Sequence, residues 1–476
     1  MKTLEKVIDT DLCIIGAGSA GLTVAAGAAQ MGARVVLMER AKMGGDCLNY
    51  GCVPSKALIA AAHRAQTMRD SKAFGIAPIE PEIDFAAVMD HVQQVIAAIA
   101  PHDSVERFTG LGVNVIQSQA RFVDHRTVEA GGQRIHAKRF IVATGSRAGI
   151  PPIPGLKDVG YLTNETVFAN RVRPEHLIVI GGGPIGMELA QAHRRLGCKV
   201  TVLEMAKALA KDDPELTAIV KQAVTGEGVM LREDVGIERV ERDGSDIAVV
   251  LKGGERIAGS HLLVAAGREP NIEELDLDNA GIRHSKRGID TDSGLRTSNK
   301  RVFAIGDVAG RYQFTHIAAE HGSLVIRRAL FGLPAKVNET SVPWCTYTDP
   351  ELANVGLSEA QSREKFGDAV KVLHFSLAEN DRAQAERITA GLVKVVVGKR
   401  GKILGAGIVA PGAGELIQPW CLAISRGLKI GAMATPILPY PTLGESSKRA
   451  AGAYYTEALF GPRVKALVRL KLWFTR

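Results

Sequence analysis

The chain has 476 residues, of which 46% are hydrophobic and 23% are charged. That length exceeds a single ordinary hydrophobic core, so we expect two to four domains. No apolar run approaches the roughly 18 residues of a membrane span, and the excess positive charge gathers towards the C-terminus, which gives little support to nucleic-acid binding. Residues 1–6 include an acid and lead straight into a strand-like run, so they do not resemble a signal peptide.

The six cysteines are too few for a disulfide framework in a chain of this size, and only Cys47 and Cys52 are close in sequence. We therefore expect a reducing cytoplasm and one working disulfide. Cys13 and Cys198 flank apolar runs and are expected to pack in the core. A metal cofactor is not expected, because two thiolates without a nearby Cys or His pair supply only half of a zinc site and the histidines are dispersed.

The first predicted elements form a strand, a glycine turn, a helix and a second strand. An apolar run over 8–16 leads into the turn, and the second strand, over 33–39, ends in Glu39. This order is the βαβ unit that binds dinucleotides. The first glycine permits the tight turn, the second lets a pyrophosphate approach the backbone, and the third allows close packing of helix on strand. The turn residues expected at the dinucleotide are Gly16, Gly18, Ser19, Ala20 and Gly21.

The same layout recurs over residues 177–204, and each terminal acid stands at the same spacing from its first glycine. A single glycine pattern is weak evidence for a dinucleotide site. Two copies, each with strand, helix and acid at the same spacing, indicate an internal repeat of that unit. Glu204 would bind a free 2′-hydroxyl and repel a 2′-phosphate, so NADH is favoured over NADPH. Lys207 and Lys211 keep NADPH open as the less favoured alternative. The residues of this second turn are Gly181, Gly183, Ile185 and Gly186.

Residues 44–56 read Gly-Gly-Asp-Cys-Leu-Asn-Tyr-Gly-Cys-Val-Pro-Ser-Lys. This segment closely resembles the redox-active segment of the flavin-dependent pyridine nucleotide-disulfide oxidoreductases, the family of dihydrolipoamide dehydrogenase, glutathione reductase and mercuric reductase. The alternative interpretation is that Cys47 and Cys52 are two buried thiols that pack as apolar side chains. The resemblance implies that FAD occupies the first unit, with Glu39 at the adenosine ribose and with Gly45 and Lys56 in the FAD site. NAD(H) then occupies the second unit.

The resemblance also implies a path for electrons, from nicotinamide to FAD, to the Cys47/Cys52 disulfide and then to the acceptor. Cys52, nearer the flavin, would form the charge-transfer thiolate, and Cys47 would attack an incoming disulfide or bind an incoming metal. A helix that begins at the cysteines would lower the thiol pKa. Lys56 and Glu188 match a family ion pair beside the flavin, and a surface pair of little consequence is the alternative.

Three further segments resemble parts of the family's FAD domain. Residues 140–146 resemble the strand and turn that leave this domain, and residues 262–271 resemble the return crossing. The strand at 301–305 ends in Gly-Asp, and a helix begins at 315, where its N-terminus would stabilise negative charge on reduced flavin. For His316 we expect a place at this helix start rather than catalysis. The cofactor-binding residues implied here are Thr144, Gly145, Ser146, Gly267, Gly306, Asp307, Thr315 and His316.

The predicted fold class is α/β, with two Rossmann-like dinucleotide-binding domains for FAD and NAD and a C-terminal α+β dimerisation domain. A proline-rich stretch at 150–155 marks the first boundary. By resemblance the protein is a homodimer in which each active site is completed by the partner's C-terminal segment. The predicted domains are 1–149 (FAD, first part), 150–270 (NAD(P)), 271–341 (FAD, second part) and 342–476 (dimerisation, with a basic tail).

Residues 439–445 depart from the family pattern. Dihydrolipoamide dehydrogenase and glutathione reductase place a histidine before Pro-Thr and a glutamate five residues after it; here Glu445 is present but Tyr440 replaces the histidine. Tyrosine, with a pKa of about 10, is a poorer base than histidine, with a pKa of about 6.5. Dihydrolipoamide oxidation is therefore expected to be inefficient. Mercuric reductase also carries a tyrosine here, facing its metal-binding thiols.

The acceptor stays open between a small thiol or disulfide and Hg(II). Residues 1–476 show neither the C-terminal vicinal cysteines nor the N-terminal metal-binding domain of mercuric reductase, so we expect the resemblance to that branch to be incomplete. A mercury(II) reductase proper, a dihydrolipoyl dehydrogenase and an electron-transfer subunit of a larger complex are the alternatives. Residues 463–474 mix bases with apolar residues, which predicts either a membrane-surface helix or a tail packed on the dimer.

Overall fold

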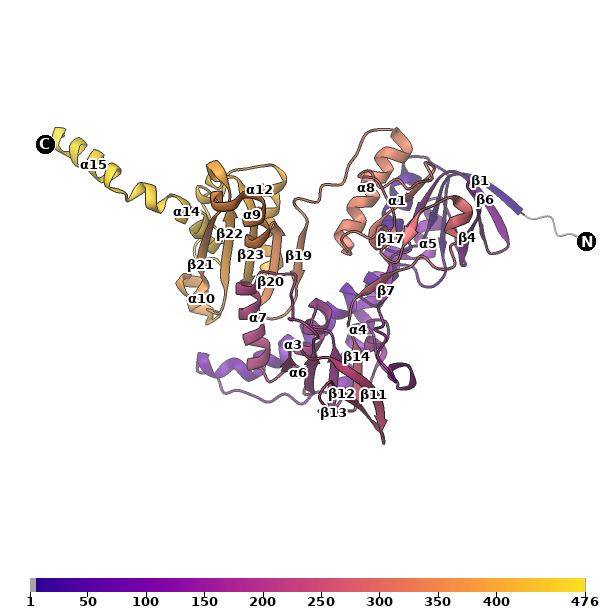
Figure 1. Cartoon of the computed structure of the whole chain (residues 1–476), viewed down its shortest axis with the longest axis horizontal. Coiled ribbons are helices and arrows are strands. Elements are labelled where there is room, and N and C mark those ends of the chain that lie inside the picture. The colour runs from indigo at the N-terminus through magenta and orange to yellow at the C-terminus, as the bar shows by residue number, and fades with distance from the viewer. Residues whose placement is uncertain (1–5, 476) are drawn as a thin grey trace, which may run out of the picture. The chain divides into compact units, whose positions relative to one another are not determined.

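The computed structural model describes residues 6–475 and is coloured by residue number in Figure 1. Residues 1–5, on which the prediction about a signal peptide rests, lie outside the described residues. Contacts divide the chain into two compact units, which we describe separately. Unit 1 holds the described residues up to Lys72, Ala77–Met205 and Leu231–Val337; unit 2 holds Ala73–Ile76, Ala206–Met230 and Asn338 to the C-terminal end.

The first βαβ segment lies in unit 1 and consists of β1 (Lys6–Ile15), α1 (Ser19–Gln30) and β2 (Val35–Glu39). The β1 strand pairs in parallel with β2 and β6, and the sheet has the order β3-β2-β1-β6-β5-β4, with β18 also paired to β6. Burial on both faces explains why β2 and the second half of β1, residues 12–15, are apolar runs. The remaining strands are β3 (Val113–Gln117), β4 (Ala120–Asp124), β5 (Thr127–Ala130), β6 (Gln133–Val142) and β18 (Val302–Ala304).

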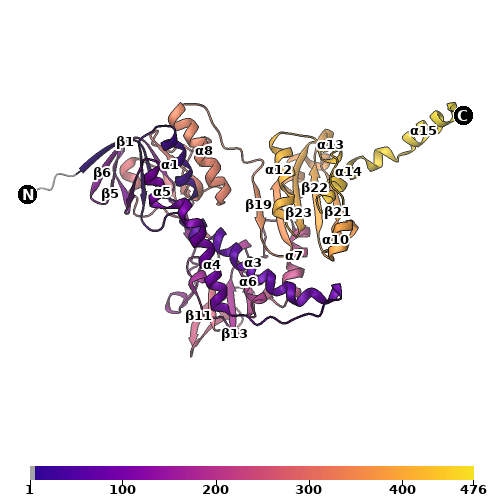
Figure 2. The same ribbon diagram turned by 180° about the vertical axis from the view of Figure 1, so that it is seen from behind.

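Helices cover this sheet and lead away from it. α8 (Thr315–Phe331) packs beside α1, as both views show (Figures 1 and 2). The segment after β2 forms the short α2 (Gly45–Asn49) and then α3 (Cys52–Arg69), which packs against α4 (Phe85–Ile99). The predicted helices at the cysteines and at residue 315 are both present, and each begins within a residue of the predicted start. A further short helix, α5 (Val105–Gly110), precedes β3.

A second βαβ segment, also in unit 1, consists of β8 (His176–Ile180), α6 (Pro184–Arg195) and β9 (Lys199–Leu203). In its sheet β8 pairs in parallel with β9 and β14, and the strand order is β10-β9-β8-β14. The predicted pair of Rossmann-like dinucleotide-binding folds is therefore confirmed. Cys13 and Cys198 are buried, as predicted. The other strands here are β10 (Met230–Arg232), β14 (His261–Val264) and the meander β11 (Ile237–Asp243), β12 (Asp246–Leu251) and β13 (Arg256–Gly259). Two small pairs of strands complete the unit, β16 (His284–Ser285) with β17 (Gly288–Ile289) and β7 (Ser146–Ala148) with β15 (Arg268–Pro270).

Unit 2 contains an antiparallel sheet with the order β19-β20-β23-β22-β21 and with helices packed on it, which confirms the predicted α+β C-terminal part. Its core surrounds the fully buried Trp420. No helix among residues 6–475 combines the length and apolarity needed to cross a membrane. The strands are β19 (Pro343–Thr346), β20 (Glu351–Gly356), β21 (Lys371–Ser376), β22 (Leu392–Val397) and β23 (Ile403–Ala410). The helices are α7 (Pro214–Gly226), α9 (Glu359–Phe366), α10 (Asp381–Glu386), α11 (Ala413–Leu416), α12 (Gln418–Ser425), α13 (Gly431–Ala434), α14 (Glu445–Leu459) and α15 (Pro462–Phe474).

A buried lysine ties α7 to this sheet. Lys394 on β22 is only 5% exposed, and its Nζ lies 2.9 Å from Asp213 Oδ2, 2.9 Å from Glu215 Oε2 and 2.8 Å from Glu359 Oε2. Burial alone would lower the pKa of Lys394, but the three carboxylates outweigh burial and raise it. The cluster explains how α7, which follows the second βαβ segment in the chain, belongs to unit 2.

Replacing Lys394 with methionine should lower the free energy of unfolding of unit 2 by about 3 kcal/mol, because the carboxylates would lose their shared cation. Denaturant titration followed by tryptophan fluorescence measures the change, since Trp420 is buried in the same unit. Lys399→Met, at an exposed site, is the matched control and should change stability by less than about 0.5 kcal/mol. Equal stability of the two variants would contradict this account of α7.

Candidate active site

The turn between β1 and α1 is shaped by close backbone contacts that only glycine permits. Gly16 has a φ of +104°, and a Cβ there would lie 2.4 Å from the carbonyl oxygen of Ala143. A Cβ at Gly21 would lie 1.9 Å from the carbonyl oxygen of Gly16. Gly18 caps α1 without a side-chain hydrogen bond, and the first turn carries no acid. The amides at Ser19 and Ala20 therefore begin a helix that suits an anion such as pyrophosphate.

The turn between β8 and α6 repeats this geometry. Gly181 has a φ of +111°, and a Cβ there would lie 2.4 Å from the carbonyl oxygen of Ala265. A Cβ at Gly186 would lie 1.9 Å from the carbonyl oxygen of Gly181. Gly183 caps α6 without a side-chain hydrogen bond, and the partly exposed Ile185 lies in the first turn. The internal repeat seen in the sequence thus extends to the backbone contacts themselves.

The two terminal acids also occupy equivalent places. Glu39 Oε2 accepts a hydrogen bond from the Ala17 amide at 2.7 Å, and Glu204 Oε2 accepts one from the Gly182 amide at 2.7 Å. Each carboxylate is therefore held over its own glycine turn. This is the position from which a carboxylate can receive hydrogen bonds from ribose hydroxyls.

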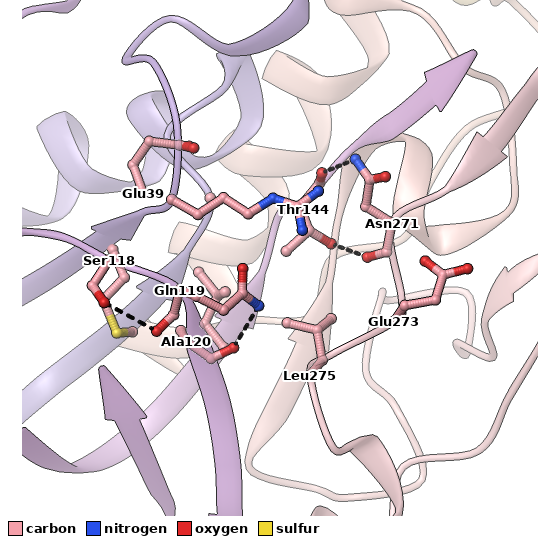
Figure 3. A pocket seen from close by; sticks show the side chains of 12 residues that line it. Glu39, Ser118, Gln119, Ala120, Thr144, Asn271, Glu273 and Leu275 are labelled. Atoms are coloured by element: carbon pink, nitrogen blue, oxygen red, sulfur yellow. Dashed lines mark hydrogen bonds between the residues drawn. The ribbon is translucent and has the colours of Figure 1, made fainter. Parts of the chain in front are cut away.

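A pocket extends from Glu39 along the same end of the first sheet, and Figure 3 shows the side chains that line it. At its far side Thr144 and Asn271 form a reciprocal pair: Thr144 Oγ1 donates to the Asn271 carbonyl at 2.7 Å, and Asn271 Nδ2 donates to the Thr144 carbonyl at 2.9 Å. The Asn271 amide also donates to the Gly145 carbonyl. Sequence reasoning missed the other labelled lining residues, Ser118, Gln119, Ala120, Glu273 and Leu275.

A chain of polar contacts links the dithiol segment to the crossing strands. Arg268 Nη2 lies 3.1 Å from Asp46 Oδ2, and Arg268 Nε donates to Ser146 Oγ at 2.7 Å. Ser146 Oγ in turn donates to Asp307 Oδ2 at 2.5 Å. Burial raises the pKa of Asp307, although Ser146 and Arg268 oppose the rise. Gly267, with a φ of +128°, and Gly306, with a φ of +69°, form the turns beside Arg268 and Asp307.

The dithiol segment packs directly on the first glycine turn. A Cβ at Gly45 would lie 2.7 Å from the Cα of Gly18, so α2 begins against that turn. Cys47 lies in α2, and Cys52 is the first residue of α3. Cys52 Sγ lies 3.3 Å from Oγ1 of Thr315, the first residue of α8. The sulfur of Cys52 is therefore held where two long helices begin.

The surroundings make Cys52 the more acidic thiol. Its pKa is lowered by a hydrogen bond from Cys47, by Thr315 and by the nearby Lys56, despite burial, which acts in the opposite direction. The same interaction with Cys52, together with burial, raises the pKa of Cys47. In the reduced pair a thiolate therefore forms more readily on Cys52 than on Cys47. Both helix N-termini add to its stability.

Lys56 and Glu188 form an ion pair in unit 1. Lys56 Nζ donates to Glu188 Oε2 at 2.8 Å, and the Glu188 side chain is buried while that of Lys56 is partly exposed. Lys56 lies one turn after Cys52 on α3, and Glu188 lies on α6. The ion pair therefore joins the helix of the thiolate to the helix of the second glycine turn.

Tyr440 and Glu445 belong to unit 2. The hydroxyl of Tyr440, in the loop before α14, donates to Asp381 Oδ2 at 2.6 Å. Glu445, the first residue of α14, accepts a hydrogen bond from Arg449 Nε at 3.3 Å. No pattern in the sequence pointed to Asp381 as a partner of Tyr440. His316, in unit 1, lies in the first turn of α8 with its ring stacked on Phe314.

The residues of the first βαβ segment fit FAD. Its glycine turn presents backbone rather than side chains, α1 begins there without an acid, and Glu39 lines the adjoining pocket. A pyrophosphate requires the first two features and an adenosine ribose the third. Among the described residues no cluster of three or more histidine, cysteine or acidic side chains could hold a metal ion.

The chain matches protein families and individual proteins over most of its length. The pyridine nucleotide-disulphide oxidoreductase family matches residues 10–322, and the dimerisation domain of the same family matches residues 342–451. The chain is 38% identical over 448 residues to a mercuric reductase from Bacillus cereus, spanning 93% of this chain and 71% of that protein. It is 36% identical to a dihydrolipoyl dehydrogenase from Geobacillus stearothermophilus, spanning 93% of this chain and 96% of that protein.

Solved structures resemble the fold over a similar extent. A Cu(II) complex of the HOCl-induced flavoprotein disulfide reductase RclA from Escherichia coli superposes with a TM-score of 0.83 at 28% identity, covering 92% of this chain and 99% of that chain. LpdA from Mycobacterium tuberculosis superposes with a TM-score of 0.86 at 26% identity, covering 94% of this chain and 99% of that chain.

In the reduced protein the Cys52 thiolate should be lost as the pH falls through about 6, its lowered pKa. Thr315→Val should raise this midpoint by about one pH unit, because a hydroxyl that donates to the thiolate is removed. Ultraviolet thiolate absorbance, taken as the difference from a Cys52→Ser variant, measures the midpoint. Thr315→Ser keeps the hydroxyl and is the control; equal midpoints for the valine and serine variants would contradict the assignment.

Proposed function

Because this chain belongs to the pyridine nucleotide-disulphide oxidoreductases, we propose that its Cys47/Cys52 pair carries electrons from NADH to a thiol, a disulfide or a metal-ion acceptor. The protein is an FAD-dependent oxidoreductase of the mercuric reductase and dihydrolipoamide dehydrogenase type. The observation that carries the proposal is the placement of Cys52 against Thr315 with its pKa lowered. Bound FAD would supply the two-electron carrier between the nicotinamide and the cysteine pair.

The thiols have separate roles in this proposal. Cys52 holds the thiolate beside the cofactor, and Cys47, whose pKa is raised, attacks the acceptor after giving up its proton. Against a disulfide, a sulfur–sulfur bond forms between Cys47 and one half of the acceptor while the acceptor's own bond breaks, and the Cys47 proton passes to the thiolate that leaves. The Cys52 thiolate then attacks the Cys47 sulfur, displaces the second acceptor thiolate and regenerates the Cys47–Cys52 disulfide. Lys56 and Glu188 fix α3 against α6 during this cycle.

NADH is the proposed electron donor. The Glu204 carboxylate is held over the second glycine turn by the Gly182 amide, where it would receive hydrogen bonds from the ribose hydroxyls. A 2′-phosphate at the same place would meet a negative charge. NADPH is accordingly the weaker substrate in this proposal.

A homodimer completes the proposed site. The family's dimerisation domain matches residues 342–451, within which Tyr440 and Glu445 lie. We place Tyr440 and Glu445 of a second copy of the chain opposite Cys47 and Cys52. Because the remaining cysteines are dispersed along the chain, we also propose that the protein acts in a reducing compartment such as the cytoplasm.

Two kinds of acceptor deserve direct comparison. Relatives named mercuric reductase and a solved Cu(II) complex of a related reductase support a soft metal ion. A dithiol acceptor running in the oxidising direction, as in a dihydrolipoyl dehydrogenase, requires a base to take the thiol proton. In this proposal Tyr440 stands at the histidine position, and its hydroxyl donates a hydrogen bond to Asp381, which argues against that direction.

Anaerobic titration with NADH should produce the long-wavelength absorbance band of a thiolate beside oxidised flavin. The concentration of NADPH needed to produce the same band should be higher than that of NADH by about tenfold or more. The reduced enzyme is then mixed separately with Hg(II), Cu(II), glutathione disulfide and lipoamide, and reoxidation of the flavin is followed. Cys52→Ser should lose the band. No band in the wild type would overturn the coupling of the cysteines to flavin, and reoxidation by none of the four would favour an electron-transfer subunit.

A second partner is proposed for α15 at the C-terminal end. Four bases and no acid lie on this helix, and none of its described side chains is buried. Figure 1 shows it, in yellow, pointing away from the sheet of its own unit. An anionic lipid surface offers both a negative charge for the bases and an apolar boundary for the aromatic and aliphatic side chains. The exposed apolar residues are Leu467, Val468, Leu470, Leu472, Trp473 and Phe474.

The protein should float with vesicles that contain anionic phospholipid and not with neutral vesicles, and deletion of residues 463–476 should abolish flotation. The truncated protein should keep its NADH-dependent flavin reduction, which shows that it is folded. If the deletion changes only the oligomeric state measured by size exclusion, the helix packs on the dimer and the lipid proposal fails.

A further inference from the structure

An acidic side chain belongs to the short segment that carries the cysteine pair. Asp46 lies in the first turn of α2, directly before Cys47. Its carboxylate also lies beside the residue that precedes Cys52, because a Cβ at Gly51 would stand only 3.0 Å from Asp46 Oδ2. A negative charge is therefore placed next to the backbone of both cysteines.

Two side chains hold the Asp46 carboxylate in this place. Asn164, which is buried, donates from Nδ2 to Asp46 Oδ1 at 3.0 Å and to the Tyr50 carbonyl at 3.2 Å. On the other carboxylate oxygen, Arg268 Nη2 lies 3.1 Å from Asp46 Oδ2, and the Arg268 side chain is mostly buried. The charge cannot turn away from the cysteine segment without breaking these contacts.

The guanidinium that pairs with Asp46 is shared with a second acid. Arg268 Nε donates to Ser146 Oγ at 2.7 Å, and Arg268 Nη2 donates to the Ser146 carbonyl at 3.0 Å. Arg268 Nε also lies 3.8 Å from Asp307 Oδ2, which accepts from Ser146 Oγ. One cation thus faces two carboxyl groups, so it does not fully offset the negative charge of Asp46.

Asp46 opposes the formation of a thiolate in the pair. The hydrogen bond between the two thiols is the largest influence on both, since it raises the pKa of Cys47 and lowers that of Cys52. Burial raises the pKa of each thiol, Thr315 lowers both, and Lys56 lowers that of Cys52. The charge of Asp46 raises both. Lys56 and Asp46 therefore act on Cys52 with opposite signs.

We propose that Asp46 makes the cysteine pair a stronger reductant of its acceptor, and that Arg268 limits this effect. The inference rests on the proposed function, in which NADH supplies two electrons to the pair through FAD. Reduction breaks the Cys47–Cys52 bond and adds two electrons and one proton. The proton binds Cys47, and Cys52 keeps a negative charge. A fixed negative charge nearby disfavours this product relative to the neutral disulfide, so the reduced pair gives up its electrons more readily.

Two substitutions with opposite effects on charge test this proposal. Asp46→Asn keeps the shape and leaves the Arg268 cation without its acid, whereas Arg268→Gln leaves Asp46 without its cation. The FAD-containing enzyme is equilibrated anaerobically, at neutral pH, with mixtures of reduced and oxidised dithiothreitol. Alkylation and mass spectrometry then measure the reduced fraction of the pair. The equilibrium constant for reduction should rise about tenfold in Asp46→Asn, or about 30 mV, and should fall in Arg268→Gln.

Three further variants separate charge from packing. Asp158→Asn, at an exposed site in the same unit, is the matched control and should leave the constant unchanged. Arg268→Lys keeps the positive charge and should lower the constant less than Arg268→Gln. The double variant of Asp46→Asn and Arg268→Gln should return towards the wild type, because both charges are removed together. Equal constants in wild type and Asp46→Asn would overturn the proposal. A shift of both single variants in the same direction would also overturn it, since a purely structural role predicts that result.

The thiolate of Cys52 gives a second readout. Its midpoint, measured by ultraviolet thiolate absorbance as the difference from Cys52→Ser, should fall by about one pH unit in Asp46→Asn and rise in Arg268→Gln. Neither readout uses NADH or an acceptor. A wild type that forms no charge-transfer band with NADH would therefore overturn the proposed function, while the equilibrium with dithiothreitol would still decide the role of Asp46.

Discussion

Close backbone approach at two glycine turns is the constraint on which the rest of unit 1 depends. At each turn the carbonyl oxygen of the first glycine occupies the space that a Cβ of the last glycine would need, at 1.9 Å in both copies. That approach brings helix and strand close enough for the helix amides and the terminal carboxylate to converge on one place. The dithiol segment then uses the first turn as its support, because Gly45 packs against Gly18. Cys52 reaches the start of α8 only because this packing fixes α2 and α3.

The two cysteines are chemically different although they are neighbours in the chain. Cys52 begins a long helix and meets the hydroxyl of Thr315 at the beginning of another, so its negative charge finds donors on two sides. Cys47 lies inside a short helix and meets mainly that negative charge, which raises its pKa. This difference suits the separate roles proposed for the two sulfurs, with Cys52 beside the cofactor and Cys47 towards the acceptor. The asymmetry therefore follows from helix positions rather than from the residues themselves.

The sequence predicted the structure correctly where a short local pattern determines it. The glycine turns, the helix starts at Cys52 and Thr315 and the α/β class follow from short patterns in which each residue type has one physical reason to be present. The Lys56–Glu188 contact followed from family resemblance, since 132 residues separate the two. Contacts without such a guide were missed: Arg268 meets Ser146 across 122 residues, and α7 belongs to unit 2 because Lys394 gathers carboxylates from distant segments. Nothing in the local pattern of Asp381 points to Tyr440, because only the folded loop of unit 2 brings them together.

The proposed exchange of a family histidine for Tyr440 would change more than the pKa of one side chain. A neutral imidazole has a donor on one nitrogen and an acceptor on the other, so an acid partner can fix one side while the other side exchanges protons with a thiol. A phenol has a single proton, and Asp381 takes it as a hydrogen bond. What remains is an oxygen with lone pairs that can accept hydrogen bonds. Glu445 pairs with Arg449. The loop before α14 thus holds its phenol by a hydrogen bond to an acid of its own unit, an arrangement that makes the phenol a poor base.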